Sequence, residues 1–113
     1  MTESRLSEYL NYMRRAGADA CSFVEGLSKD EFLADKRTQQ AVIMSLVIIG
    51  EAATKIMDQH AEFAASHPEV PWRTCAGCGT GSLGYFEINL DIVWETVQTA
   101  LPEMLAKLPA SNS

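Results

Sequence analysis

The segment Cys75–Phe86, CAGCGTGSLGYF, differs in composition from the chain on either side of it. It combines two cysteines with four glycines and has no charged side chain, whereas its flanks have the apolar spacing of amphipathic helices. Thiolates of this kind can bind a metal or exchange a disulfide, and backbone amides of glycine-rich loops can hold a phosphate. The segment is therefore either a functional site or an accident of the sequence.

The cysteines of this segment form a single Cys-x-x-Cys pair, Cys75 and Cys78. A structural zinc site needs four ligands, and the other candidates, Cys21, His60 and His67, are not paired at ligand spacing. A thioredoxin-type site needs a strand before the pair and a helix after it, and neither is indicated. We therefore expect no bound metal and no cofactor.

The glycines of the segment, Gly77, Gly79, Gly81 and Gly84, have some likeness to a phosphate-binding loop. Such a loop is followed by Lys and then Ser or Thr, and it joins a strand to a helix. This chain has neither feature, so a P-loop is disfavoured.

The remaining polar candidates lie outside the segment. His60 and His67 are isolated, which is typical of solvated or helix-capping histidines. Glu51 is either a catalytic carboxylate or a buried, hydrogen-bonded structural residue. The aromatic residues Trp72, just before the segment, and Tyr85, near its end, are expected to anchor it to the rest of the domain.

Length and charge limit the class of protein. A chain of 113 residues predicts one domain, residues 1–113. Its net charge of −6 provides no general attraction for nucleic acid, so such contact would need a local patch or a partner. The polar start MTESRLSEYL has no signal-peptide pattern, and the longest apolar run, Ala41–Ile49, is too short to span a bilayer. We expect a cytoplasmic protein without membrane contact.

Helical periodicity dominates the first part of the chain. Apolar residues recur every three to four positions over Leu6–Leu27, which predicts a long amphipathic helix ended by Gly26 and Ser28. Ser28 and Glu31 have the spacing of a capping box, so a short helix should follow, to about Ala34.

A core helix is predicted from Thr38 to about Phe63. The run Ala41–Ile49 is apolar on nearly every side, so this helix is either wrapped by other helices or shared with a second subunit. Gly50 would cost about 1 kcal/mol relative to Ala in a helix interior, which indicates close approach of another element there.

The last part of the chain predicts one further helix after a break at Pro68 and Pro71. Asn89 is suited to cap that helix, and Pro102 predicts a kink or restart near Ala100. No run of strand length alternates between apolar and polar residues. The expected fold is an all-α, four- to five-helix, up-and-down bundle.

Four pieces of the sequence resemble the HepT-like (DUF86) branch of the HEPN superfamily. They are the runs IIGEAA at Ile48–Ala53, VPWR at Val70–Arg73, GYF at Gly84–Phe86, and INLDIVW at Ile88–Trp94. The earlier helices fit in length and pattern, so the resemblance covers nearly the whole chain.

The resemblance implies a dimeric helical bundle that cleaves RNA as the toxin of a pair with a nucleotidyltransferase antitoxin. In the family motif Arg-Asn-x-x-x-His, followed by Gly-Tyr-Phe, Arg stabilises the phosphate and His transfers protons at the ribose 2′-OH, without a metal. The resemblance also implies that the motif's tyrosine, Tyr85 here, is the site where the antitoxin attaches AMP. We expect Glu51 and Arg73 to line this site.

The chain departs from the family at the motif itself. Family members have a run such as MRGMRNRIAH, and neither its motif Arg nor its His is present here. The motif position is occupied by Cys75, Ala76, Gly77, Cys78, Gly79, Thr80, Gly81, Ser82 and Leu83. The segment therefore provides no general base and no cation for the phosphate. If it stands as written, its glycines predict mobility, with Cys75 and Cys78 exposed and open to oxidation.

A shifted reading frame accounts for this departure. Codons for Cys75–Leu83, read from one base upstream, become NTG YGC NGG NTG YGG NAC NGG NTC NCT. When the bases written N and Y, which the amino-acid sequence leaves undetermined, are chosen suitably, these codons encode Met-Arg-Gly-Met-Arg-Asn-Arg-Ile-Ala. This is the start of the family run. Three hypotheses follow: a ribonuclease whose catalytic pair is missing or misread, an inactive module that binds the nucleotidyltransferase or RNA, and a plain helical scaffold.

Overall fold

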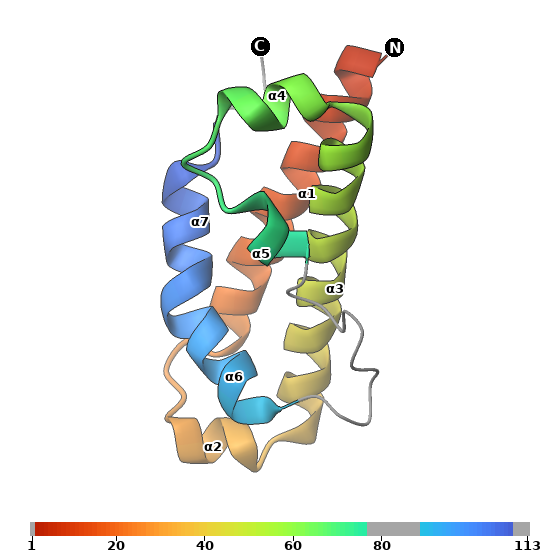
Figure 1. Cartoon of the computed structure of the whole chain (residues 1–113). Coiled ribbons are helices and arrows are strands. Elements are labelled where there is room, and N and C mark those ends of the chain that lie inside the picture. Colours follow the sequence, from red (N-terminus) through yellow and green to blue (C-terminus); the bar gives the residue numbers. More distant parts are fainter. Residues whose placement is uncertain (1, 77–88, 110–113) are drawn as a thin grey trace.

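The computed structural model describes residues 2–76 and 89–109, and these form an all-α bundle (Figure 1). No strand occurs in either of these two ranges. The predicted fold class is therefore confirmed. The elements are α1 Thr2–Phe23, α2 Lys29–Leu33, α3 Lys36–Gln59, α4 Ala61–Ser66, α5 Trp72–Ala76, α6 Leu90–Glu95, the π-helical turn η2 Thr96–Ala100 and α7 Leu101–Lys107.

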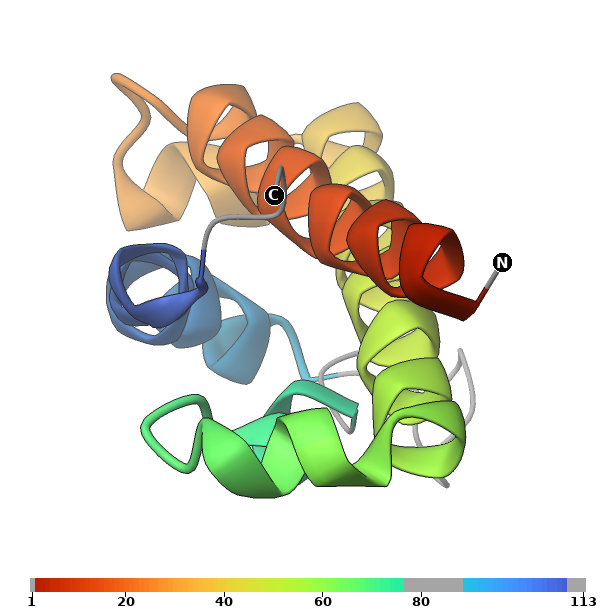
Figure 2. The same cartoon turned by 90° about the horizontal axis from the view of Figure 1, so that it is seen from above.

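The two long helices, α1 and α3, pack against each other and form one half of the bundle. Seen from above, α4 and α5 lie on a second side, and the α6–α7 segment lies on a third (Figure 2). The apolar faces of the first and last helices are buried in one core cluster. Its members from these helices include Leu10, Met13, Ala16, Ala20, Val93, Val97, Leu101 and Met104.

The turn between α1 and α2 follows the sequence signals closely. Helix α1 ends at Phe23, and Gly26 has a φ of +83°, a left-handed conformation that favours glycine. The Ser28 side chain accepts from the Glu31 backbone N–H at 3.1 Å, and the Glu31 carboxylate accepts from the Ser28 N–H at 2.9 Å. The predicted capping box is confirmed.

The core helix differs from its predicted bounds at both ends. It begins at Lys36 because Asp35 caps it, accepting from the Thr38 backbone N–H at 3.2 Å and from the Thr38 hydroxyl at 2.7 Å. These hydrogen bonds hold the pKa of Asp35 below its ordinary value. At the other end, the backbone of His60 leaves the helical region, so the predicted continuation to Phe63 becomes the separate helix α4.

Pro102 has the predicted effect on the last helix. The Leu101 backbone N–H donates to the Thr96 carbonyl, five residues back, which widens the turn before Pro102 into a π-helix. A proline cannot donate to the carbonyl four residues before it, so the regular ladder is interrupted there. The predicted kink or restart near Ala100 is confirmed as the junction of η2 and α7.

Within the described part of the chain, α3 has the length and mean hydropathy of a membrane-crossing helix. The core helix of a helical bundle meets the same criteria, and α3 buries Val42, Leu46, Ile49 and Ile56 against its neighbours. Its outer side is less well covered, because Met44 and Ile48 are exposed. The other helices therefore enclose α3 only in part.

Candidate functional site

The segment singled out in the sequence begins inside a short helix, α5, that its composition did not predict. The Cys75 backbone N–H donates to the Pro71 carbonyl at 2.9 Å, closing the first turn. Proline is common at the start of helices, because it needs no N–H partner there. Pro71 was therefore a usable signal for a helix start, rather than only for a break.

Trp72 fixes α5 to α4. Its indole N–H lies 3.1 Å from both the Ala64 and the His67 carbonyl oxygens, and its side chain is buried. The ring also meets Phe63 edge-on at a centroid distance of 6.2 Å. His67 Nδ1 lies 3.0 Å from the Phe63 carbonyl at the end of α4. The anchoring role predicted for Trp72 and the capping role predicted for His67 are both confirmed.

The end of α5 packs directly on the core helix at Gly50. A Cβ atom added to Gly50 would lie 2.9 Å from the carbonyl oxygen of Ala76, so only glycine allows this approach. The predicted close contact at Gly50 is confirmed. Cys75 is buried in the same contact region, with 3% of its surface exposed. The expectation that Cys75 is open to oxidation is therefore wrong, because α5 turns it into the core.

Replacing Gly50 by alanine is expected to lower the free energy of unfolding by up to about 2 kcal/mol. The gain in helix propensity, about 1 kcal/mol, is outweighed by overpacking against a backbone carbonyl that cannot rotate away, which costs about 1–3 kcal/mol. Urea denaturation measures the difference. Gly17→Ala is the matched control, since its nearest contact would be the flexible end of Met104 at 3.0 Å. An equal loss in both variants would contradict the contact.

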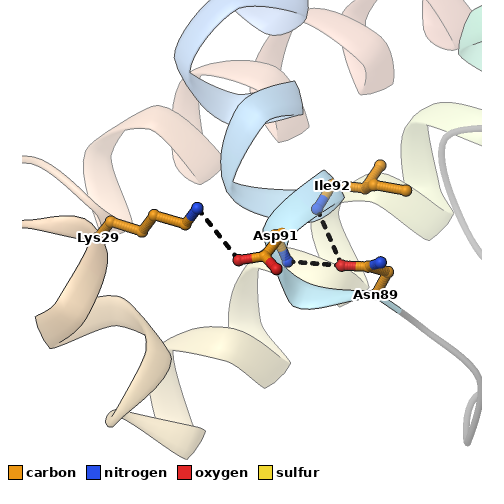
Figure 3. A network of polar contacts seen from close by, with 4 residues as sticks. All are labelled: Lys29, Asn89, Asp91 and Ile92. Atoms are coloured by element: carbon orange, nitrogen blue, oxygen red, sulfur yellow. Dashed lines mark hydrogen bonds and ion pairs between the residues drawn. The ribbon is translucent and has the colours of Figure 1, made fainter.

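The other end of the segment is held where α6 begins. The Asn89 side chain accepts from the backbone N–H groups of Asp91, at 2.9 Å, and Ile92, at 3.3 Å, so the predicted N-cap is confirmed. Asp91 also pairs with Lys29 of α2 at 3.1 Å (Figure 3). The ion pair with Lys29 links the start of α6 to α2.

The motif position thus begins at the end of α5, where Ala76 packs on α3, and the described chain resumes at Asn89, the cap of α6. Of the residues at that position, Cys75 and Ala76 are described. The stretch from Gly77 to Leu83, with the predicted mobility and the exposure of Cys78, lies outside the described residues, as does Tyr85.

Arg73 is exposed near the beginning of the motif position, on the side of α5 away from the core. It borders a groove of about 380 Å³ between α4, α5 and the connection that joins them. Met57, Ala64, Ala65, Pro68, Val70, Pro71, Trp72 and Thr74 form the rest of its lining. A guanidinium in this place can contact a phosphate through charge-assisted hydrogen bonds.

Glu51 lies on a different side of the bundle. It is exposed, so the interpretation of Glu51 as a buried structural residue is wrong. Successive residues of a helix are turned by roughly 100°, and the preceding residue, Gly50, faces α5. Glu51 instead borders a groove between α1 and α3, with a volume of about 340 Å³ and a lining of Tyr9, Tyr12, Ile48, Ala52 and Lys55. Within the described residues, Glu51 and Arg73, both expected to line one site, border different grooves.

The remaining candidate ligands are scattered. Among the residues that the structure describes, no three His, Cys, Asp or Glu side chains gather in a way that could hold a metal. The Cys21 thiol lies 4.0 Å from the Val97 carbonyl, and burial raises its pKa. His60 joins α3 to α4 with its ring edge-on to Tyr9, and its buried Nε2 has no hydrogen-bond partner among the described residues. Its side chain does not cap α4, unlike the role predicted for it.

The described residues define a helical-bundle domain in which a tryptophan-anchored helix leads into the motif position and a capped helix begins after it. The sequence profile of the ribonuclease HepT-like family matches residues 13–110 of the chain. The chain therefore belongs to this family, the HepT-like branch of the HEPN superfamily, as the resemblance implied.

Individual relatives agree with this assignment. The chain is 36% identical over 91 residues to the candidate RNase MJ0127 of Methanocaldococcus jannaschii, covering 80% of this chain and 73% of the relative. It is 36% identical over 95 residues to the probable ribonuclease HepT of Thermococcus cleftensis, covering 80% and 84%. The candidate RNase TTE0752 of Caldanaerobacter subterraneus subsp. tengcongensis is 37% identical over 82 residues, covering 72% and 70%. No solved structure gives a significant match.

Proposed function

We propose that this chain is the ribonuclease component of a toxin–antitoxin pair and acts in the cytoplasm as a homodimer. The observation that carries this proposal is the family match over residues 13–110, which spans the motif position. The names of the relatives support RNA as the substrate. The partner is a nucleotidyltransferase antitoxin that attaches AMP to Tyr85.

The chemistry of the proposed site is proton transfer beside a charged phosphate. In the family motif, His moves protons at the ribose 2′-OH, and Arg neutralises the charge that builds up on the phosphate. Arg73, exposed near the beginning of the motif position, is a further cation within this chain. We propose that it contacts the RNA backbone, and that Glu51, on another side of the bundle, does not.

The segment at Cys75–Leu83 is best explained as a frame-shifted copy of the ribonuclease motif. Loss of one base near Thr74 and of two more after Leu83 would produce the present segment and restore the frame at Gly84. Resequencing the gene tests this hypothesis. An in-frame Met-Arg run would show a sequencing error. Confirmed codons for CAGCGTGSL would show that the gene has lost the motif. The mass of the intact protein reports the same difference.

The second candidate function is an inactive module that still binds its nucleotidyltransferase. The observation that favours it is the absence of both motif residues from Cys75–Leu83. Incubating the purified chain with a short RNA and a chelator separates the two functions. Cleavage in the presence of chelator, by this chain or only after the family motif is restored, would support the ribonuclease with a missing or misread motif. No cleavage by either chain, together with retained binding of the antitoxin, would establish the module, and a monomer that binds no partner would contradict both.

A further inference from the structure

The groove between α4 and α5 that Arg73 borders, the α4–α5 groove, differs in charge from two other grooves on the described chain. The groove between α1 and α3 has Glu51 beside Lys55, and a groove of about 250 Å³ along α6 and η2 is lined by Asp91 and Glu95. Among the described residues that line the α4–α5 groove there is one cation, Arg73, and no carboxylate. An anionic ligand therefore meets like charge in the other two grooves and only opposite charge in this one.

The wall of the α4–α5 groove is apolar. Apart from Arg73 and Thr74, the described side chains that line it carry no free polar group, because the indole N–H of Trp72 is already donated to backbone carbonyls. Small-molecule sites combine an apolar wall with a few polar groups and have volumes of about 300–1,000 Å³. With about 380 Å³, this groove is large enough for a flat ring against its wall, with an anion beside Arg73 at its edge.

The α4–α5 groove also adjoins the motif position. Thr74, which lines the groove, directly precedes Cys75, the first residue of the motif position. Arg73 and Thr74 are exposed on α5, whereas Trp72 and Cys75 are buried and hold this helix on the bundle. A strand of RNA bound at the motif position can therefore continue over Arg73 into the groove without displacing a core contact.

We propose that the α4–α5 groove holds one unpaired base of a single-stranded RNA, and that Arg73 contacts the phosphate of that nucleotide. A base inside a duplex is stacked between its neighbours, so only an unpaired nucleotide can lay its ring against the apolar wall. Reading one base against another requires several hydrogen-bonding groups, so a wall of this kind distinguishes a nucleotide with a base from one without. This inference rests on RNA as the substrate in the proposed function and specifies the class of RNA.

The experiment is to measure the binding of a labelled oligouridylate of about eight nucleotides to the full chain by fluorescence anisotropy. The unaltered chain should bind it at least about fivefold more tightly than an abasic strand of the same length, the lower end of what one stacked base contributes. Ala65→Phe fills the groove without changing its charge and should remove this difference. Ala18→Phe is the matched control, because Ala18 is exposed on α1, and should preserve the difference. Circular dichroism checks that each variant is folded.

The salt dependence of the same binding tests the role of Arg73. Loss of one phosphate contact lowers the slope of the logarithm of the binding constant against the logarithm of the salt concentration by about 0.7 for a single strand. Arg73→Ala should show this fall with both the oligouridylate and the abasic strand, and Arg73→Lys should keep the slope. Arg37→Ala is the matched control, because Arg37 is exposed on α3, and should leave the slope unchanged.

The outcomes separate this inference from the proposed function. If the oligouridylate binds but Ala65→Phe has no effect, or if the abasic strand binds equally well, the groove holds no base and this inference is wrong, while RNA remains the proposed substrate. If Arg73→Ala leaves the slope unchanged, the phosphate contact is wrong as well. No binding by this chain, nor by the chain with the family motif restored, would contradict RNA as the substrate.

Discussion

Replacing Trp72 by alanine is expected to lower the free energy of unfolding by about 3–5 kcal/mol, the usual cost of removing a buried aromatic side chain. Trp72 is 7% exposed and packs on Phe63, so the change leaves a cavity beneath α5. It also removes the donor shared by the Ala64 and His67 carbonyls. Urea denaturation followed by circular dichroism measures this loss.

Trp72→Phe separates the two contributions. It keeps a six-membered aromatic ring but removes the indole N–H and the rest of the five-membered ring. The expected loss is smaller, about 0.5–1.5 kcal/mol for the lost hydrogen bond in addition to the lost ring volume, because the Ala64 and His67 carbonyls still accept from the His67 and Val70 backbone N–H groups. Hydrogen exchange should show that the Cys75 amide, bonded to the Pro71 carbonyl, exchanges faster in both variants. If Trp72→Ala had the stability of the unaltered chain and the same hydrogen-exchange rate at the Cys75 amide, Trp72 would not be what holds α5 in place.

Restoring the family motif is expected to have the largest effect on activity. Replacing Cys75–Leu83 by the run MRGMRNRIAH returns the Arg and His that the segment lacks. The restored chain should cleave a short RNA in the presence of chelator, whereas the unaltered chain should not. The cleavage rate, measured from labelled RNA fragments on a gel, checks this prediction.

A restored chain that carries alanine instead of the inserted histidine is the matched control. Positioned acid–base catalysis typically contributes about 10²–10⁴-fold, so the rate should fall by a factor in that range. Equal cleavage by both restored chains would point to a contaminating nuclease. No cleavage by a folded, dimeric restored chain would contradict the frame-shift hypothesis and favour the inactive binding module.

Local signals predicted the helix boundaries that depend on short-range contacts. The capping box at Ser28 and Glu31, the N-cap at Asn89 and the break before Pro102 each involve groups only a few residues apart. Such hydrogen bonds form wherever the chain enters or leaves a helix, so the residue types alone indicate them. The predicted bounds of α3 were less accurate, because no strong breaker marks its end at His60.

Contacts between distant parts of the chain were not predictable in the same way. The composition of Cys75–Phe86 indicated an open, glycine-rich segment, yet its first residues form α5 and bury Cys75. The sequence suggested that some element approaches Gly50, but it could not say that this element is the end of α5. Which element packs on Gly50 depends on the path of the chain through α4 and on the contacts by which Trp72 fixes α5 to α4.

The sequence by itself determined the all-α class, the family and the departure of Cys75–Leu83 from the family motif. These follow from residue types and their spacing, which are properties of the chain before it folds. Only the tertiary structure decided that Glu51 and Arg73 lie on different sides of the bundle, and that Met44 and Ile48 remain exposed. Those outcomes depend on which face of α3 is covered by α1 and α5, and helical periodicity does not specify the neighbour of each face.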